Sequence, residues 1–366
     1  MASCGLAAGA DAVFEAVKNG VKEKKINAAV KKAGCIGLCH QEPLVDIIVP
    51  GNARLTYGKV TPKKVSELLD CLEQKKIPGG AIGKIDSEHF LLEDTLHEYA
   101  KDTSDERYAD IPLYDELPFY SKQSRIALRN CGYIDPEDIR EYAAKGGYSS
   151  LTRILGKKSP SQVITDVERS GRRGRGGAGF STGLKWKICH NAKSDQKYII
   201  CNADEGDPGA YMDRSILEGD PHSVIEGMII AGYSIGASTG YIYVRDEYPL
   251  AIERLEKALS QAAKNGILGR NIMGSGFDFN ISINRGAGAF VCGEETALLK
   301  SIEGSWGEPR QRPPYPAQSG LWGKPTVINN VETLATIPVV IGKGPQWFSS
   351  IGTEKSKGTK VFSLVG

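Results

Sequence analysis

The chain has 366 residues, a formal net charge of +2 and 40% hydrophobic side chains. These values are typical of a globular protein with two or three domains of roughly 150 residues each, and they exclude the strongly basic balance of a nucleic-acid-binding protein. No apolar run approaches the roughly 20 residues of a membrane helix, and no signal-peptide pattern is present. The eight cysteines are read as reduced thiols or cluster ligands. We therefore expect a cytoplasmic protein with no membrane span and no nucleic-acid partner.

Residues 1–80 are expected to form a small α/β unit. Apolar side chains recur with helical spacing over residues 11–24. Short apolar runs separated by a Pro-Gly-Asn turn predict strands at 44–49 and 54–60. A second helix is expected directly after Thr61, which has the side chain of an N-cap and is followed by proline.

Residues 81–148 are charged and rich in tyrosine, and we expect them to form a connecting arm with one helix at 136–144. Residues 149–345 are expected to form the main domain. There, strand-like runs at 198–201, 240–244 and 278–283 alternate with helical stretches, a pattern that predicts an α/β domain with a largely parallel sheet.

The first motif is a glycine-rich segment that ends in Gly174-Arg-Gly-Gly-Ala-Gly-Phe180 and is soon followed by Lys185. Several glycines allow backbone N–H groups to point into one concavity, which suits an anionic or flat polar ligand. The segment lacks the Gly-Lys-Ser/Thr of a nucleotide-triphosphate loop and meets the dinucleotide fingerprint only loosely. Taken alone, it is equally consistent with a flexible surface loop.

The second motif runs from Asn202 through Asp204, Glu205 and Asp207, directly after a predicted strand. Ligands of open α/β sheets bind at the carboxyl ends of strands, so these side chains could accept hydrogen bonds from a ribose or an amide. The alternative is an acidic turn that caps a helix.

The third motif is Gly293-Glu294-Glu295, which we place at the start of a helix. Paired acids at that position also stabilise a helix through its dipole, so the motif alone does not require a ligand.

The fourth motif contains Arg312 and Tyr315 in a proline-rich segment and continues to Asn329, Asn330 and Thr333. The prolines hold a cation and an aromatic ring at set positions. The uncharged polar residues at the end predict a helix start that could bind a phosphate. Each part could also be an ordinary loop or cap.

In this order the four motifs resemble the FMN- and NADH-binding flavoprotein subunit of respiratory complex I. The same module occurs in NAD-linked and electron-bifurcating hydrogenases and in formate dehydrogenases. The resemblance covers about residues 85–366 and implies a Rossmann-like FMN and NADH domain. The residues that it implies around FMN are Gly174, Arg175, Gly176, Gly177, Ala178, Gly179, Lys185, Asn202, Asp204, Glu205, Gly293, Glu294, Glu295, Asn329, Asn330 and Thr333.

The resemblance also implies where NADH lies and how it reacts. The residues expected to contact NADH are Phe180, Asp207, Arg312 and Tyr315. The sequence departs from the respiratory pattern on this side, with Asp207 in place of Glu and Ile188 in place of an aromatic residue, which puts the preference for NADH over NADPH in question. Hydride transfer to a flavin needs orientation more than side-chain chemistry. We assign Glu205 and Glu295 to the catalytic site as electrostatic tuning residues.

Three cysteines near the N-terminus form a candidate metal site. Cys35 and Cys39 have the spacing of one cysteine pair in thioredoxin-like [2Fe–2S] ferredoxin domains, and Cys4 resembles one member of the other pair. Such a cluster takes four ligands, so the start of the domain is missing, the cluster is incomplete, or it is absent. The family's [4Fe–4S] ligand segment is not found in the sequence. We read residues 346–366, with a strand-like run at 359–365, as the start of truncated ubiquitin-like and cluster domains.

From the sequence we expect the NADH-oxidising flavoprotein subunit of a multi-subunit NADH dehydrogenase, hydrogenase or formate dehydrogenase. Its partners would be NADH or NAD⁺, a thioredoxin-like [2Fe–2S] ferredoxin subunit and further iron–sulfur subunits. One alternative is a non-catalytic scaffold or electron-conduit subunit that has lost FMN. A second alternative, an ATP-dependent enzyme, conflicts with the missing Walker lysine.

Overall fold

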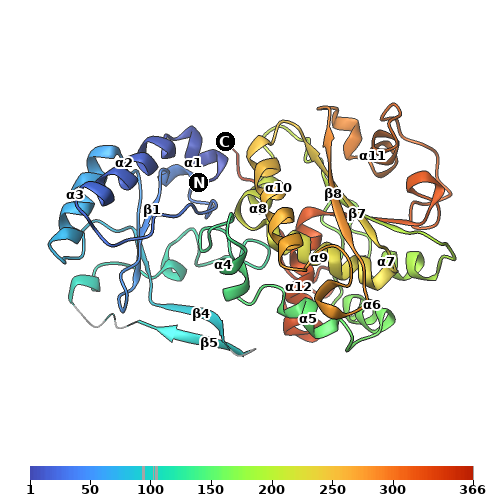
Figure 1. The fold of residues 1–366 in the computed structure, drawn as a ribbon, viewed down its shortest axis with the longest axis horizontal. Coiled ribbons are helices and arrows are strands. Elements are labelled where there is room, and N and C mark those ends of the chain that lie inside the picture. The colour runs from blue at the N-terminus through green and yellow to red at the C-terminus, as the bar shows by residue number, and fades with distance from the viewer. Residues whose placement is uncertain (93–94, 102, 104–105, 366) are drawn as a thin grey trace. The chain divides into compact units, whose positions relative to one another are not determined.

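The computed structural model describes the chain except for residues 93, 94, 102, 104, 105 and 366. The chain divides into two compact units, and Figure 1 labels the elements of each. Unit 1 comprises residues 1–124, 130–135 and 144–146; unit 2 comprises residues 125–129, 136–143 and 147–366. None of the described helices is long and apolar enough to cross a membrane.

Unit 1 confirms the small α/β arrangement expected for the start of the chain. Its helices and strands are α1 (Ser3–Ala7), α2 (Ala10–Glu23), β1 (Val45–Ile47), β2 (Arg54–Tyr57), α3 (Pro62–Glu73) and β3 (Gly83–Ile85). The strands form an antiparallel sheet in the order β1-β2-β3. Thr61 caps α3 by accepting a hydrogen bond from the Lys64 backbone, and α2 and α3 pack side by side (Figure 1).

A second sheet in unit 1 lies in the region that we expected to be a connecting arm. The antiparallel hairpin of β4 (Ser87–Leu92) and β5 (Thr95–Ala100) was not predicted, because its charged side chains hide the alternation that marks a strand. The expected helix at 136–144 is the shorter α4 (Ile139–Ala144). All of it except Ala144 belongs to unit 2, together with α5 (Ser149–Ile154) and α6 (Pro160–Arg169).

Unit 2 confirms the predicted α/β domain. Its four-stranded sheet is entirely parallel, in the order β8-β7-β6-β9. The elements that build it are α7 (Thr182–Asn191), β6 (Tyr198–Ala203), α8 (Met212–Gly219), α9 (Pro221–Ile235), β7 (Thr239–Arg245), α10 (Pro249–Lys264), β8 (Asn280–Gly286), α11 (Glu295–Ile302), β9 (Thr326–Asn330), α12 (Val331–Lys343) and α13 (Pro345–Ser349). The strands expected at 198–201, 240–244 and 278–283 are β6, β7 and β8.

The two faces of this sheet are covered by different helices. Ile200 and Ile328 pack with Leu298 and Leu299 of α11 on one face. Helices α9 and α12 pack against each other and against β6 on the other face. Helix α9 is buried around nearly its whole circumference, as its apolar composition requires. A Cβ on Gly227 would lie 2.1 Å from the Leu334 carbonyl oxygen, so glycine is what allows α9 and α12 to approach so closely.

In unit 2 one strand was missed and one predicted strand was wrong. Strand β9 was not predicted, because its apolar run of Val327 and Ile328 is very short. The expected strand at 359–365 does not form; the described residues there have no regular secondary structure. The Thr359 carbonyl accepts hydrogen bonds from Arg175 and the Val361 N–H donates to Glu332, so backbone groups that a strand would pair are bonded to side chains.

Candidate functional site: a crevice at the ends of β6 and β9

The candidate site lies where the chain reverses its direction across the sheet. The chain steps from β6 to β7 to β8 and then crosses back to place β9 on the other side of β6. In open α/β sheets ligands bind outside the carboxyl ends of the two strands at such a switch point, and we call this part of unit 2 the crevice. Asn202 at the end of β6 is paired in register with Asn330 at the end of β9, so predicted residues from two distant motifs lie together there.

The glycine-rich motif forms a closed loop against this crevice. A bridge between Arg173 and Ser181 and a hydrogen bond of 2.8 Å from Gly174 N to the Phe180 carbonyl close its base. The Arg175 N–H donates to the Thr333 hydroxyl over 3.0 Å, which ties the loop to the first turn of α12. A Cβ built on Gly176 would lie 3.4 Å from the Asn330 Cβ.

Gly177 shows why the loop tip requires glycine. Its φ of +104° lies in a region that other residues rarely adopt, and a Cβ there would meet nothing within 4 Å. Because this space is open, no neighbouring protein atom forces Gly177 into its positive φ. Exposed backbone of this kind can approach a ligand closely, which is the property expected from the sequence.

Buried charged side chains support the glycine-rich loop. Glu332 lies 3.9 Å from Arg172 and 3.6 Å from Arg175. Burial, together with the nearby charge of Arg175 and against the opposing effect of Glu332, lowers the pKa of Arg172 to about 9. The Arg175 guanidinium also donates to the carbonyls of Lys357 and Thr359. The side chain of Arg175 therefore supports the loop, and only its backbone faces Thr333.

Helix α7 brings two adjacent side chains to the crevice. The Lys185 ammonium donates to Glu295 of α11 and, over 3.1 Å, to the Ile328 carbonyl of β9. Buried Trp186 donates its indole N–H to the Asn329 side chain over 2.8 Å. Because Lys185 joins α7, β9 and α11, it brings the first, third and fourth motifs together at one point.

The end of β6 carries an incompletely bonded carboxylate. Asn202 donates to the Gly293 carbonyl over 2.9 Å and accepts from Asp204 N over 3.1 Å. Asp204 Oδ2 is buried and accepts no hydrogen bond from the described residues. Burial raises the pKa of Asp204 to about 6, although Arg245, 3.8 Å away, opposes this. A buried atom such as Oδ2 keeps an unused capacity to accept a hydrogen bond.

Glu205 has a structural task within the site. Its carboxylate accepts hydrogen bonds from the backbone N–H groups of Met212, Asp213 and Arg214, and thus caps α8. Burial raises the pKa of Glu205, and the three backbone donors oppose the shift. Buried Asp213 in turn accepts from the Asn330 side chain over 2.6 Å.

The acids of the third motif lie beside the cation of the fourth. Glu294 caps α11 by accepting from the Thr296 and Ala297 backbone. Burial alone would raise the pKa of Glu294, but these hydrogen bonds and Arg312 leave it lowered. Arg312 lies 3.6 Å from Glu294 and 3.9 Å from Glu295.

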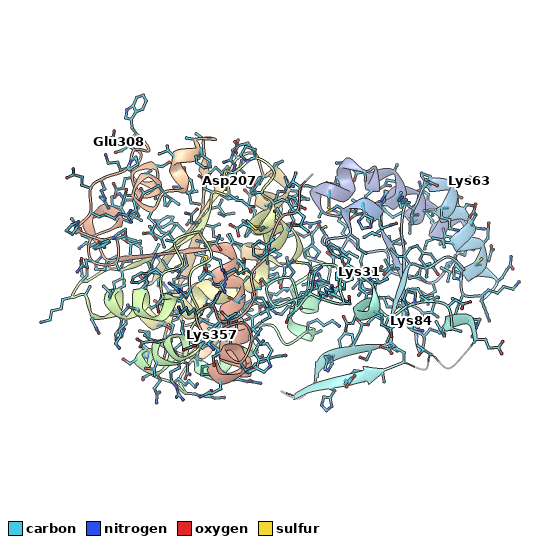
Figure 2. The ribbon with its side chains drawn as sticks, turned by 180° about the vertical axis from the view of Figure 1, so that it is seen from behind. Lys31, Lys63, Lys84, Asp207, Glu308 and Lys357 are labelled. Carbon is cyan, nitrogen blue, oxygen red and sulfur yellow. The ribbon has the colours of Figure 1, made fainter. Side chains whose placement is uncertain are left out.

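The side chains expected to contact a nicotinamide nucleotide are exposed. Phe180 and Tyr315 keep 46% and 55% of their surface in solvent, which is high for aromatic residues. Asp207 is exposed on the loop that follows β6, and Figure 2 labels it. The structure thus leaves two aromatic rings and an acid available for a ligand, but it does not show them in contact with one another.

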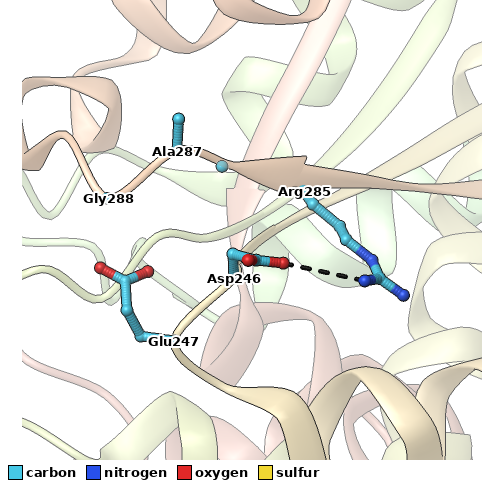
Figure 3. A pocket seen from close by; sticks show the side chains of 6 residues that line it. Asp246, Glu247, Arg285, Ala287 and Gly288 are labelled. Carbon is cyan, nitrogen blue, oxygen red and sulfur yellow. Dashed lines mark ion pairs between the residues drawn. The ribbon is translucent and has the colours of Figure 1, made fainter.

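An open hollow lies at the neighbouring strand ends, beyond β7 and β8 (Figure 3). Asp246 and Glu247 line it, and Arg285 lies 3.8 Å from Asp246. Glu247 accepts a hydrogen bond of 2.8 Å from Arg245, the arginine that also approaches Asp204. The charged residues that line the hollow are thus two carboxylates and one guanidinium.

Sequence reasoning missed several residues that build the crevice, namely Arg172, Trp186, Asp213, Arg245 and Glu332. Four of them are buried side chains that are charged or carry one polar group, and the side chain of Arg245 is largely buried. One signal was available, since Trp186 directly follows Lys185 and a buried indole N–H needs an acceptor. The others are recognised only by partners that are distant in the sequence.

In unit 1 the three predicted cysteines come together. The sulfur atoms of Cys4, Cys35 and Cys39 all lie within 4.8 Å of one another and could hold a metal centre. Hydrogen bonds among the three thiols lower the pKa of Cys39 and raise the pKa of Cys4 and of Cys35, so Cys39 is the thiol most readily deprotonated. A lowered pKa favours the thiolate, the form that binds metals.

Comparison with known proteins supports the interpretation of unit 2 as an FMN-binding domain. The model of the Nuo51 FMN-binding domain matches residues 167–339. The NADP-reducing hydrogenase subunit HndC of Solidesulfovibrio fructosivorans is 62% identical over 245 residues, which cover 67% of this chain and 50% of that protein. An NADH-quinone oxidoreductase subunit of Rhizobium meliloti (strain 1021) is 50% identical over 241 residues, 66% of this chain and 57% of that protein.

Two further similarities extend over nearly the whole chain. The NAD-reducing hydrogenase HoxS subunit alpha of Cupriavidus necator is 39% identical over 343 residues, 91% of this chain and 49% of that protein. A crystal structure of an NAD⁺-reducing [NiFe]-hydrogenase in the air-oxidized state superimposes with a TM-score of 0.54 and 28% identity, covering 98% of this chain and 54% of that one. The chain thus spans about half the length of the relatives it matches. Residues 167–339 belong to the family of Nuo51 FMN-binding domains, and the homologues of the chain are subunits of NADH-quinone oxidoreductases and of NAD(P)-reducing hydrogenases.

Proposed function

We propose that the crevice binds FMN and that the chain oxidises NADH by hydride transfer to it, within a larger electron-transfer complex. One observation carries this proposal. The glycine loop, Lys185 and the carboxyl ends of β6 and β9 converge on one crevice at the switch point of a parallel sheet. Polar groups from motifs that are spread over more than a hundred residues lie together there, as binding of a shared ligand would require.

The residues fit FMN in two respects. The open space at Gly177 lets backbone approach a flat ring, and Asp204 Oδ2 can accept a ribityl or ring hydrogen bond. The first turn of α12, at Asn330 and Thr333, would lie at the phosphate end, because a helix N-terminus favours an anion. The proposed FMN residues are Gly174, Arg175, Gly176, Gly177, Ala178, Gly179, Lys185, Asn202, Asp204, Glu205, Gly293, Glu294, Glu295, Asn329, Asn330 and Thr333.

NADH would bind on the exposed side of this crevice. Phe180 and Tyr315 offer aromatic surface for stacking, Arg312 offers a cation, and Asp207 would lie near the ribose. Stacking against exposed rings orients a planar base at little conformational cost. NADH would then meet the ring of FMN from the solvent side.

FMN supplies the hydride acceptor. The chain therefore needs to bind FMN and NADH, to orient them, and to tune the reaction electrostatically. Lys185 and Arg312 hold Glu295 from two sides, which keeps a negative charge at a set place beside the crevice. Glu205 adds a second carboxylate, held by three backbone donors. We assign both glutamates to electrostatic tuning of the reaction and not to a covalent step.

The wider assembly is also part of the proposal. The relatives named above are subunits of NADH-quinone oxidoreductases and of NAD(P)-reducing hydrogenases. By analogy, electrons from this chain would pass to iron–sulfur subunits, including a thioredoxin-like [2Fe–2S] ferredoxin subunit. Within the chain we propose a ferredoxin-like unit at 1–80, an arm at 81–148, the FMN and NADH domain at 149–345 and the start of a further domain at 346–366.

Flavin binding by the purified chain tests the proposal. FMN should bind more tightly than riboflavin, because only FMN offers a phosphate to α12. Lys185→Met should weaken FMN binding by roughly 10- to 100-fold, the cost of about 1.5–3 kcal/mol for a lost charged hydrogen bond. Lys187→Met, on the exposed side of the same helix, should leave binding unchanged. Equal affinity for FMN and riboflavin, or no flavin binding, would contradict the proposal and favour a scaffold without flavin.

A further inference from the structure

Arg172 is a buried arginine whose hydrogen bonds do not account for its burial. Its side chain is fully enclosed by protein. Nη2 donates to the Glu332 carbonyl over 2.9 Å, whereas Nε and Nη1 have no hydrogen-bond partner among the residues that the structure describes. Removing a guanidinium from water is costly unless its donors are satisfied. The position of Arg172 therefore calls for an explanation beyond local bonding.

Arg172 belongs to a cluster of buried charges formed by Arg172, Arg175 and Glu332. The Glu332 carboxylate lies 3.9 Å from Arg172 and 3.6 Å from Arg175, and its Oε1 atom accepts no hydrogen bond from the described part of the chain. With a pKa of about 9, the Arg172 guanidinium remains protonated at neutral pH. Two guanidinium groups and at most one charged carboxylate give the cluster a net positive charge.

This cluster joins the glycine-rich loop to the helix start proposed above for the FMN phosphate. Glu332 lies in the first turn of α12, next to Thr333. The Thr333 hydroxyl accepts a hydrogen bond of 3.0 Å from Arg175 N. Arg172 lies at the base of the loop, where its carbonyl accepts from Thr182 N over 3.0 Å. A charge on Arg172 is therefore built into the support of both segments.

Two acids in this region would repel a phosphate if nothing offset them. One is Asp213, which accepts from the Asn330 side chain over 2.6 Å. Burial is the main cause that raises the pKa of Asp213, and this favours its neutral form. The other is Glu332, where burial also raises the pKa but Arg172 and Arg175 oppose the shift. The positive charge of the arginines offsets the Glu332 carboxylate, so that the helix start can still favour an anion.

We propose that Arg172 determines specificity for flavins that carry a phosphate, by offsetting the charge of Glu332 at the first turn of α12. Arg172 is a positioning residue in this proposal, because it acts through Glu332 and the loop. Charges that are buried away from solvent are screened little by salt, so one enclosed guanidinium can change the affinity for a phosphate. The inference rests on the proposed flavin site and names a residue that sets its preference.

Fluorescence titration of the flavin-free chain with FMN and with riboflavin tests the proposal. The readout is the ratio of the two affinities, because general loosening of the loop would weaken the binding of both flavins. Arg172→Met should lower the preference for FMN roughly tenfold, about 1.4 kcal/mol. Arg172→Lys, which keeps the charge, should retain most of the preference. Arg169→Met removes an exposed arginine at the end of α6 and is the matched control, which should leave the ratio unchanged.

A second substitution separates the charge of Arg172 from its packing. Glu332→Gln should raise the preference for FMN, and Arg172→Met combined with Glu332→Gln should bring the ratio back toward that of the unmutated chain. If Arg172→Met does not fold, Glu332→Gln tests the same charge alone. The proposal is overturned if Arg172→Met keeps the unmutated ratio, if the double variant keeps the lowered ratio, or if Glu332→Gln does not raise it. A chain that binds neither flavin would instead contradict the proposed function.

Discussion

At the scale of single residues, glycine in the loop was predictable from the sequence, whereas its buried supports were not. A run of glycines indicates close approach of backbone whatever the fold, and Gly177 has the positive φ that such a loop needs. By contrast, Asp213 and Glu332 depend on partners more than a hundred residues away, Asn330 and Arg172. No local pattern distinguishes such a buried acid from an exposed one.

Gly177→Val should strongly weaken FMN binding while leaving the chain folded. Valine adds a side chain in the space that the ring would occupy, and we expect affinity to fall roughly tenfold or more, about 1.4 kcal/mol. Flavin absorbance of the purified variant measures this. Gly276→Val is the matched control, because Gly276 also has positive φ and open space around its Cβ position but lies before β8. Full flavin retention in Gly177→Val would remove the loop from the site.

Asp207 should favour NADH over NADPH. A 2′-phosphate beside this exposed carboxylate would be repelled, so Asp207→Ala should narrow the NADH preference about fivefold, the effect of ~1 kcal/mol from a screened charge pair. Steady-state rates with both nucleotides measure this. Asp195→Ala, an exposed acid before the amino end of β6, should not change the ratio. Equal rates with NADH and NADPH in the unmutated chain would contradict the placement of Asp207, and one relative is indeed named as NADP-reducing.

Asp204 should make the flavin-free protein less stable as the pH rises. Its pKa of about 6 in the folded chain, raised by burial, lies above the ordinary value of 3.8. Folding therefore favours the protonated form, and this contribution is present at low pH and lost between about pH 4 and pH 6. The unfolding temperature of Asp204→Asn, relative to that of the unmutated chain, should rise across that pH window. Asp246→Asn, which removes an exposed charge, is the control. If the unfolding temperatures of Asp204→Asn and of the unmutated chain change with pH in parallel, Asp204 does not titrate in this pH window.

At the scale of elements, helices α2 and α3 and strands β6, β7 and β8 were predicted from the sequence. Strand β9 was not, because two apolar residues, Val327 and Ile328, do not separate a strand from a loop. The run at 359–365 alternates like a strand, but pairing requires a neighbouring edge. In the described part of that segment Arg175 and Glu332 bond to the backbone instead.

Glu205 should prove to be a helix cap as well as a charge near the flavin. Glu205→Ala removes the acceptor of three backbone N–H groups at α8, and we expect a loss of roughly 1–2 kcal/mol in the free energy of unfolding. Chemical denaturation measures it. Asp207→Ala, two positions away and outside the cap, should cost much less. An unchanged free energy of unfolding in Glu205→Ala would mean that α8 does not depend on this carboxylate.

At the scale of the whole molecule, the sequence predicted an α/β chain with a parallel-sheet domain, and the order of the motifs predicted its family. The strand order could not be read from the sequence, because it depends on which side of β6 the last strand is added. That choice creates the switch point, and with it the crevice. The candidate site could therefore be located only from the topology, although its residues had been predicted from the sequence.

The central claim is that this crevice holds FMN and transfers hydride from NADH to it. The most direct test is an anaerobic titration of the purified, FMN-loaded chain with NADH while the visible absorbance of the flavin is followed. We expect one NADH to bleach one flavin, and ferricyanide to restore the colour. If the bound flavin keeps its colour under excess NADH, or if the chain cannot be loaded with FMN at all, the account is contradicted.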